Sequence, residues 1–297
     1  MELVIPARRR SLGGFEVGRV LPYAPRRMVG PFVFFDHMGP TTFPPGIPHD
    51  ADVRPHPHIG LSTITYLFKG EITHRDSTGV QQPIRPGEVN WMTAGRGITH
   101  SERFDAMRGP GGDMDGIQAW VALPEADEEP TPGFDHFAAS DLPTWEEAGL
   151  HARLIAGLAF GKTSEVRTFS PMFYVHAQLD ADGRVELPTG HAERAAYVAE
   201  GEVEIDGRTF GHGEMVVFGP AETPDIRAST AANVMLLGGE ALGPRHIWWN
   251  FVSSSQERIE QAKADWLAGR FKLPDHDRDE FIPLPQDPPP PRPEPMS

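Results

Sequence analysis

The chain has no cysteine. That absence excludes disulfide bridges, zinc–thiolate sites, iron–sulfur clusters and cysteine nucleophiles. Any metal site must therefore use histidine, aspartate or glutamate. Basic residues are also scarce, since 27 lysines and arginines stand against 42 acidic residues and the formal net charge is -15. This balance argues against direct binding of nucleic acid and against attraction to anionic membranes.

Long apolar stretches are missing as well. No run of about 18 apolar residues occurs, and no apolar core of a secretory signal follows the basic residues of "MELVIPARRRSLGGFEVGRVLP". We therefore expect a cytoplasmic protein with no membrane partner. With 297 residues, the chain has room for two domains or for one large β architecture.

Glycine and proline are abundant, with 31 of each, and they separate short runs of Val, Ile, Phe, Tyr and Thr. This pattern is typical of an all-β fold. Two blocks also repeat in the same order. "TYLFKGEI" (65–72) matches "AYVAEGEV" (196–203), and "RPGEVNWMTAG" (85–95) matches "GHGEMVVFGPA" (211–221). The repeat predicts a duplicated β-barrel, with the acidic segment 123–137 as an exposed connection between the halves.

One helix is predicted near the C-terminus. Ser254 and Glu257 have the spacing of a capping box, and Ile259, Ala262 and Trp266 recur on one face. We expect an amphipathic helix over about 254–268 that packs on a sheet or edge and has a structural role. The tail "DPPPPRPEP" (287–295) favours polyproline II and can bury little.

Two histidine-containing pairs suggest a metal site. His56 and His58 are two residues apart, as are His100 and Glu102 on a second predicted strand. Side chains two apart on a strand share a face about 7 Å along, so two such strands in a barrel could bring four ligands together. A lone His-x-His pair is more often an exposed polar pair. Three imidazoles and one carboxylate would suit Fe, Mn, Co, Ni, Cu or Zn.

Two other histidines receive weaker interpretations. His37 could line a pocket, although a hydrogen-bonded loop histidine is the alternative. His74 alternates with Arg75 and is expected in the polar periphery of its strand.

At these residues the chain resembles the pirin family of the cupin superfamily. The resemblance is carried by "HPHIGLSTITYLFKGEITHRDSTG", "IRPGEVNWMTAGRGITHSE" and "WWNFVSSSQERIEQAKADW". It implies two cupin β-barrels face to face: residues 1–135 with one metal, and residues 136–297 without metal, followed by the helix and the Pro-rich tail. The family's ligands fall on His56, His58, His100 and Glu102. Where a generic cupin carries a further Glu, this chain has Ser62 and Thr63, so Glu102 supplies the carboxylate.

The second half lacks these ligand types at the matching places. The repeat puts Leu187 and Thr189 at the positions of His56 and His58, and Ile226 and Ala228 near those of His100 and Glu102. We therefore expect a structural or interface role for this half.

The resemblance implies a function. Bacterial pirin-like proteins are associated with quercetin 2,3-dioxygenase activity, in which a flavonol chelates the metal and O2 cleaves its heterocycle with loss of carbon monoxide. In that interpretation the partners are a flavonol-like aromatic substrate and O2, Fe(II) is the expected ion, and Glu102 is both ligand and base. The apolar pocket walls would come from Phe34, Met38, Trp91 and Met92, beside His37.

Two alternatives remain at this stage. The protein could be a non-enzymatic, iron-dependent redox regulator that acts through a protein partner. It could also be a dioxygenase for another small phenol.

Overall fold

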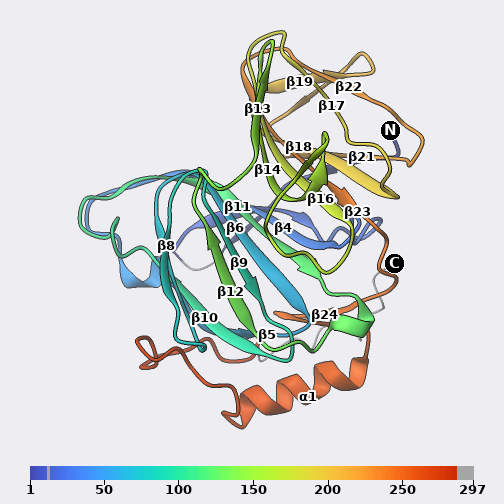
Figure 1. Cartoon of the computed structure of the whole chain (residues 1–297). Helices are drawn as coiled ribbons and strands as arrows, with labels where there is room; N and C mark the ends of the chain where they lie inside the picture. The colour runs from blue at the N-terminus through green and yellow to red at the C-terminus, as the bar shows by residue number, and fades with distance from the viewer. Residues whose placement is uncertain (12–13, 286–297) are drawn as a thin grey trace. The chain divides into compact units, whose positions relative to one another are not determined.

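The computed structural model describes residues 1–11 and 14–285 (Figure 1). Over this part of the chain the backbone is mostly β-strand, and the one α-helix, α1 (Gln256–Leu267), lies near the C-terminus. The prediction of an all-β fold with a C-terminal helix is confirmed. The Pro-rich segment 287–295 lies outside the described residues.

The chain forms two compact units, each made of more than one segment. We call residues 10–17, 38–136 and 242 onward the N-terminal barrel, and residues 1–9, 18–37 and 137–241 the C-terminal barrel. The division passes through strands β2, β3 and β4. Each barrel is built on a larger and a smaller antiparallel sheet.

The N-terminal barrel uses a seven-stranded sheet and a four-stranded sheet. In spatial order, the larger sheet contains β12 (Gly133–Phe137), β9 (Val89–Thr93), β6 (Leu61–Lys69), β11 (Gly112–Ala122), β4 (Phe32–Phe43), β3 (Glu16–Leu21) and β2 (Arg8–Ser11). The smaller sheet contains β5 (Val53–His58), β10 (Ile98–Arg103), β7 (Ile72–Asp76) and β8 (Gln81–Ile84). Apolar side chains of both sheets, including Leu67, Ile72 and Ile84, share one buried core.

The C-terminal barrel repeats this plan. Its larger sheet contains β1 (Leu3–Pro6), β21 (Glu214–Phe218), β18 (Glu193–Glu200), β23 (Ala232–Gly239), β16 (Met172–Leu179), β14 (Leu150–Ala159) and β13 (Thr144–Glu147), with β15 (Lys162–Thr163) paired to β14. Its smaller sheet contains β17 (Arg184–Glu186), β22 (Asp225–Ala228), β19 (Glu202–Ile205) and β20 (Arg208–Gly211). The remaining elements are the hairpin β24 (His246–Trp248) and β25 (Phe251–Ser253), and the 3-10 helices at His49–Ala51 and Glu125–Asp127.

The two barrels match strand by strand, and the repeated sequence blocks lie on equivalent strands. β6 and β7 correspond to β18 and β19, and each pair is joined at a glycine with positive φ, Gly70 at 89° and Gly201 at 77°. A Cβ at Gly201 would come within 2.2 Å of the carbonyl oxygen of Ala231. Only glycine fits this turn without strain, which explains the shared Gly-Glu in both blocks.

The helix packs as its sequence predicts, but its N-cap lies one residue later than the capping box indicated. Ser255, not Ser254, is the N-cap, and its hydroxyl accepts a hydrogen bond from the backbone N–H of Arg258. Ile259, Ala262 and Trp266 are its buried residues. They pack against Ile59, Trp248 and Phe251 of the N-terminal barrel, so that α1, drawn in orange-red in Figure 1, contacts the hairpin β24–β25.

The structure divides the chain differently from a cut at residue 135. The segment 242–285, with α1, belongs to the N-terminal barrel, while residues 1–9 and 18–37 belong to the C-terminal barrel. The reason is long-range pairing: β1 adds to the edge of β21, and α1 buries its apolar face near Ile59. The segment 123–137 is not a plain exposed connection, because Glu128 is buried and forms an ion pair with Arg245 at 3.0 Å.

The packing of α1 generates a stability prediction. Ile259→Ala removes a fully buried side chain and should lower the free energy of unfolding by about 2–5 kcal/mol. Leu267→Ala is the matched control on the same helix, because Leu267 is 75% exposed; it should change stability by less than about 0.5 kcal/mol. Denaturant melts compare the two variants. Equal losses would show that α1 is not held by this apolar face.

Candidate metal centre

Two neighbouring strands bring three histidines together. β5 and β10 pair antiparallel, with His56 opposite His100 and His58 opposite Ile98. The ring centroids of His56 and His100 are 4.4 Å apart, and those of His58 and His100 are 5.0 Å apart. One nitrogen from each ring lies within 4.8 Å of the others. All three side chains are buried, with exposures of 6%, 1% and 1% in chain order.

Each imidazole has its Nδ1 occupied by a partner. His56 Nδ1 is 2.8 Å from the carbonyl oxygen of Arg54, and His58 Nδ1 is 3.1 Å from that of Asn250. A carbonyl oxygen only accepts, so these Nδ1 atoms carry the proton and donate. The Nε2 atoms then keep a free lone pair, as metal ligands require. His100 Nδ1 lies 3.3 Å from His74 Nδ1, and His100 Nε2 is buried without a hydrogen-bond partner.

Burial keeps these ligands neutral. It lowers the pKa of His56 to about 4 and holds the pKa of His58 and His100 well below the ordinary value, with smaller contributions from the neighbouring imidazoles. Neutral imidazoles are the form that binds a cation. The residues therefore fit a first-row divalent metal in both protonation and geometry.

His74 belongs to this site, contrary to the prediction that it lies in the polar periphery. β7 is an inner strand of the smaller sheet, and His74 pairs with Glu102 of β10. Its side chain is buried, and its ring stacks on Phe134 with centroids 4.4 Å apart. Its Nε2 is 3.0 Å from Asp76 Oδ2. The sequence signal that could have placed His74 correctly is its spacing from Ile72: residues two apart on a strand share a face, and Ile72 lies in the core.

Glu102 lies beside the three histidines but outside their cluster. A register shift separates it from His100 in the pairing with β5. Its carboxylate is 3.5 Å from Thr65 Oγ1, and Thr65 in turn donates to Gln118 Oε1 at 2.9 Å. Burial raises the pKa of Glu102 to about 7, and the nearby Thr65 hydroxyl opposes this in part. Glu102 as the fourth ligand remains a prediction, because it requires the carboxylate to turn from Thr65 to the imidazoles.

The opposite face of β10 is fixed by the chain that follows α1. Ser101 and Arg103 alternate with the site residues and point the other way. Ser101 Oγ donates to Asp277 Oδ2 at 2.6 Å, and the Arg103 guanidinium donates to both oxygens of Asp277 at 2.7 Å. The strand that carries two site residues is thus held from both faces.

Comparison with known proteins gives the family. A family model described as Pirin matches residues 14–121, and one described as Pirin C-terminal cupin domain matches residues 174–272. The chain belongs to the pirin family. The first match contains all three clustered histidines.

Similar proteins cover nearly the whole pirin chain. A pirin-like protein of Caulobacter vibrioides is 62% identical over 96% of this chain and 100% of its own length. The crystal structure of a quercetin 2,3-dioxygenase from Acinetobacter baumannii is 33% identical, with a TM-score of 0.88 over 98% of this chain and 97% of that one. A second quercetin 2,3-dioxygenase structure from this organism is 27% identical, with a TM-score of 0.84 over 91% and 97% of the two chains.

The predicted pocket residues Trp91 and Met92 lie on opposite faces of β9. Trp91 pairs with Ile64, so it faces the side of β6 opposite to Thr65, whereas Met92 pairs with Thr63 and faces the same side as Thr65. Met38 packs in the barrel core with Phe43 and Leu67.

Phe34 and His37 belong to the C-terminal barrel. The guanidinium of Arg19 lies 4.5 Å from the Phe34 ring centroid, and His37 Nδ1 is 2.8 Å from Tyr197 Oη. His37 is hydrogen-bonded as one interpretation held, but it lies in strand β4 and not in a loop. Sequence reasoning missed Thr65 and Gln118, and it also missed Trp120, whose ring centroid is 5.0 Å from that of His58.

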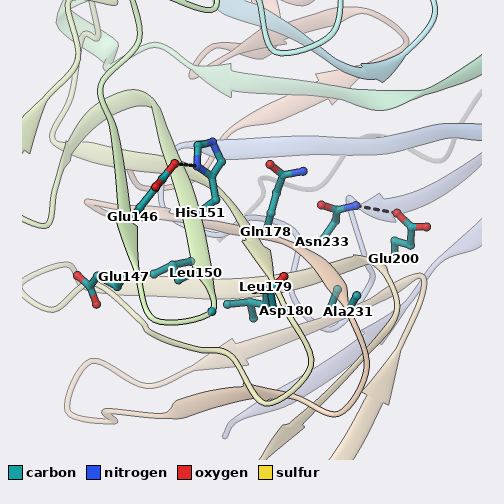
Figure 2. A pocket seen from close by; sticks show the side chains of 12 residues that line it. Glu146, Glu147, Leu150, His151, Gln178, Leu179, Asp180, Glu200, Ala231 and Asn233 are labelled. Carbon is teal, nitrogen blue, oxygen red and sulfur yellow. Dashed lines mark hydrogen bonds and ion pairs between the residues drawn. The ribbon is translucent and has the colours of Figure 1, made fainter.

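The C-terminal barrel of the pirin has apolar residues at the equivalent positions. Ile226 pairs with Ile205, as Glu102 pairs with His74, so the strand pairing places Ile226 at the position of Glu102 and not at that of His100, where the sequence repeat put it. Both isoleucines are buried in the core with Leu187. This barrel contains a cavity of about 560 Å³. Figure 2 shows two interactions in its lining, one between Glu146 and His151 and one between Asn233 and Glu200. None of the three clustered histidines lines it. In the described part of the chain, no helix is both long and apolar enough to span a membrane.

The ligand assignment can be tested by removing one imidazole. Loss of a residue that hydrogen-bonds to a metal ligand typically lowers metal affinity by about 10–100-fold. His56→Ala removes a ligand itself, so it should lower the affinity for a divalent metal by more than this. His151→Ala is the control, because this histidine lies on the exposed face near Glu146 in the other barrel. Metal content after dialysis and competition with a chelator measure both. Retention of a full equivalent of metal by His56→Ala would exclude this histidine as a ligand.

Proposed function

We propose that this member of the pirin family is a metal-dependent dioxygenase that cleaves a flavonol-like substrate with O2, as a quercetin 2,3-dioxygenase does. The observation that carries the proposal is the buried set of three neutral imidazoles whose Nδ1 atoms are occupied by other partners, next to a carboxyl group whose pKa burial raises to about 7. The 33% identity to a quercetin 2,3-dioxygenase of known structure supports it. The 62% identical relative is named only a pirin-like protein, a name that specifies no reaction.

His56, His58 and His100 would hold the ion, with Glu102 as fourth ligand. Fe(II) is the ion we expect, and Mn, Ni, Co, Cu or Zn also suit nitrogen and oxygen ligands. When bound, the ion supplies a Lewis acid for the hydroxyl oxygen of the substrate and a binding position for O2. The side chains of the protein would supply the proton acceptor and orient the substrate.

Glu102 would take the proton of the substrate hydroxyl. In the metal-free protein, burial raises the pKa of Glu102 to about 7. A cation bound beside it would lower this pKa again, so the carboxylate of the loaded site is ionised before substrate enters. Thr65 lies next to this carboxylate and is itself held by Gln118, so it would help to orient the carboxylate.

Burial of the imidazoles has a second consequence. Their exposures of 6% or less leave little room for bulk water around the ion. Electrostatic interactions within such a site are stronger than in water, and competing hydrolysis is suppressed.

The proposed reaction is tested with quercetin in air. The protein is loaded separately with Fe(II), Mn(II), Ni(II), Co(II) and Cu(II), and the loss of flavonol absorbance is followed together with release of carbon monoxide. We expect turnover with at least one ion, and none in a His100→Ala variant treated in the same way. Absence of turnover with every ion would refute the enzyme proposal and favour a redox regulator that acts through a protein partner.

The role of Glu102 predicts a pH dependence of metal binding. Below pH 7 the carboxyl of the metal-free protein holds a proton that the metal must displace. The affinity should therefore fall by about tenfold per pH unit between pH 7 and 5 if Glu102 is a ligand. The histidines add little there, because the pKa of His56 is about 4 and those of His58 and His100 lie well below the ordinary value.

Glu102→Gln is the matching variant. This variant should remove the dependence of metal affinity on pH between about pH 7 and 5. It should retain much of the metal and abolish quercetin turnover. An identical slope in both proteins would exclude Glu102 as a ligand, and undiminished turnover would exclude it as the base.

A further inference from the structure

We infer that Asp76 and His74 are positioning residues that determine which nitrogen of His100 carries the proton, and thereby keep His100 Nε2 free for the metal. The inference rests on the metal centre of the proposed function but not on the reaction. Neither residue touches the metal position. Both act through His100.

The first step is the fixed orientation of the Asp76 carboxylate. Its Oδ1 accepts hydrogen bonds from Thr78 N at 2.8 Å, Thr78 Oγ1 at 2.6 Å and Val80 N at 3.3 Å. These donors belong to the tight turn that follows β7, which is closed by Asp76 N donating to Val80 O at 3.0 Å. Oδ1 is therefore committed to the turn, and Oδ2 is the oxygen that faces His74.

The second step is the transmission of this orientation through two rings. An ionised carboxylate only accepts, so His74 Nε2, at 3.0 Å from Asp76 Oδ2, must donate. Neutral His74 then has a lone pair on Nδ1. His100 Nδ1, at 3.3 Å from that atom, must carry a proton. Neutral His100 is left with a lone pair on Nε2, the buried atom that has no hydrogen-bond partner in the protein.

The third step is that the rings cannot easily escape this arrangement. His74 is buried and stacked on Phe134, and β7 pairs directly with β10. His56 and His58 differ in this respect, because their Nδ1 atoms face backbone carbonyl oxygens that can never become donors. Among the three ligands, only His100 depends on a side-chain partner whose proton can move.

Asp76→Asn tests the relay with almost no change of shape. The turn donors retain the amide oxygen, so the amide NH2 faces His74 Nε2 and donates to it. His74 must then carry its proton on Nδ1, His100 must accept there, and the His100 proton moves to Nε2. We expect the affinity for Ni(II), measured by chelator competition, to fall by about 10–100-fold. Imidazole ¹⁵N NMR of the metal-free protein should show both tautomers reversed.

Two further variants separate the relay from a general loss of structure. Asp105→Asn is the matched control. Asp105 forms an ion pair with Arg75, which lies on β7 beside Asp76, but Asp105 does not contact His74. This variant should leave both the Ni(II) affinity and the tautomers unchanged. The double variant His74→Phe with Asp76→Asn removes the ring that transmits the wrong tautomer. It should bind Ni(II) more tightly than Asp76→Asn alone, although it carries one more substitution in the same buried region.

Several results would overturn the inference. They are unchanged tautomers in Asp76→Asn, a double variant that binds no better than Asp76→Asn, or a wild-type spectrum with His100 protonated at Nε2. The wild-type spectrum decides the question even if Asp76→Asn does not fold. Because none of these measurements uses quercetin, the relay and the dioxygenase proposal can fail independently.

Discussion

The metal centre depends on one constraint: every imidazole must donate from Nδ1 to something outside the cluster, so that every Nε2 lone pair faces inward. The carbonyl oxygens of Arg54 and Asn250 meet this constraint for two ligands, and His74 meets it for the third. The Asn250 contact explains part of the architecture. It is supplied by the segment after residue 242, which returns to the N-terminal barrel and is anchored there by α1.

The two barrels show what the same scaffold does with and without polar ligands. At the place where β10 and β7 present Glu102 and His74, β22 and β19 present Ile226 and Ile205. Apolar residues at such positions complete a core and need no partners. Buried imidazoles and carboxylates require hydrogen bonds or a cation to offset their desolvation. The polar network around His74 and Asp76 is therefore the expected accompaniment of a site, and it is confined to the barrel that has the clustered histidines.

Local patterns in the sequence predicted much of this structure. The two-residue spacing of His56 and His58 placed them on one face of a strand, and the spacing of Ile259, Ala262 and Trp266 identified the buried face of α1. Each inference needed only the period of a strand or a helix. The repeated Gly-Glu blocks likewise predicted two equivalent barrels, because their glycines occupy turns that exclude other residues.

The sequence did not predict features that depend on partners far away in the chain, or on which of the two faces of a strand a side chain occupies. The return of the C-terminal segment cannot be read from local pattern, since it depends on packing between Ile59 and Trp248. Trp91 and Met92 are adjacent in the sequence and face opposite sides of β9, so they cannot both line the same face of this sheet. His74 was assigned to the periphery from its polar neighbour Arg75, although its alternation with Ile72 indicated the interior.

Anomalous diffraction from crystals of the metal-loaded protein, recorded at the absorption edge of the bound ion, tests the central claim most directly. The account predicts one ion in the N-terminal barrel, bound by the Nε2 atoms of His56, His58 and His100 at about 2.0–2.2 Å. An ion bound through any Nδ1 atom, or one located away from these three histidines, would contradict it.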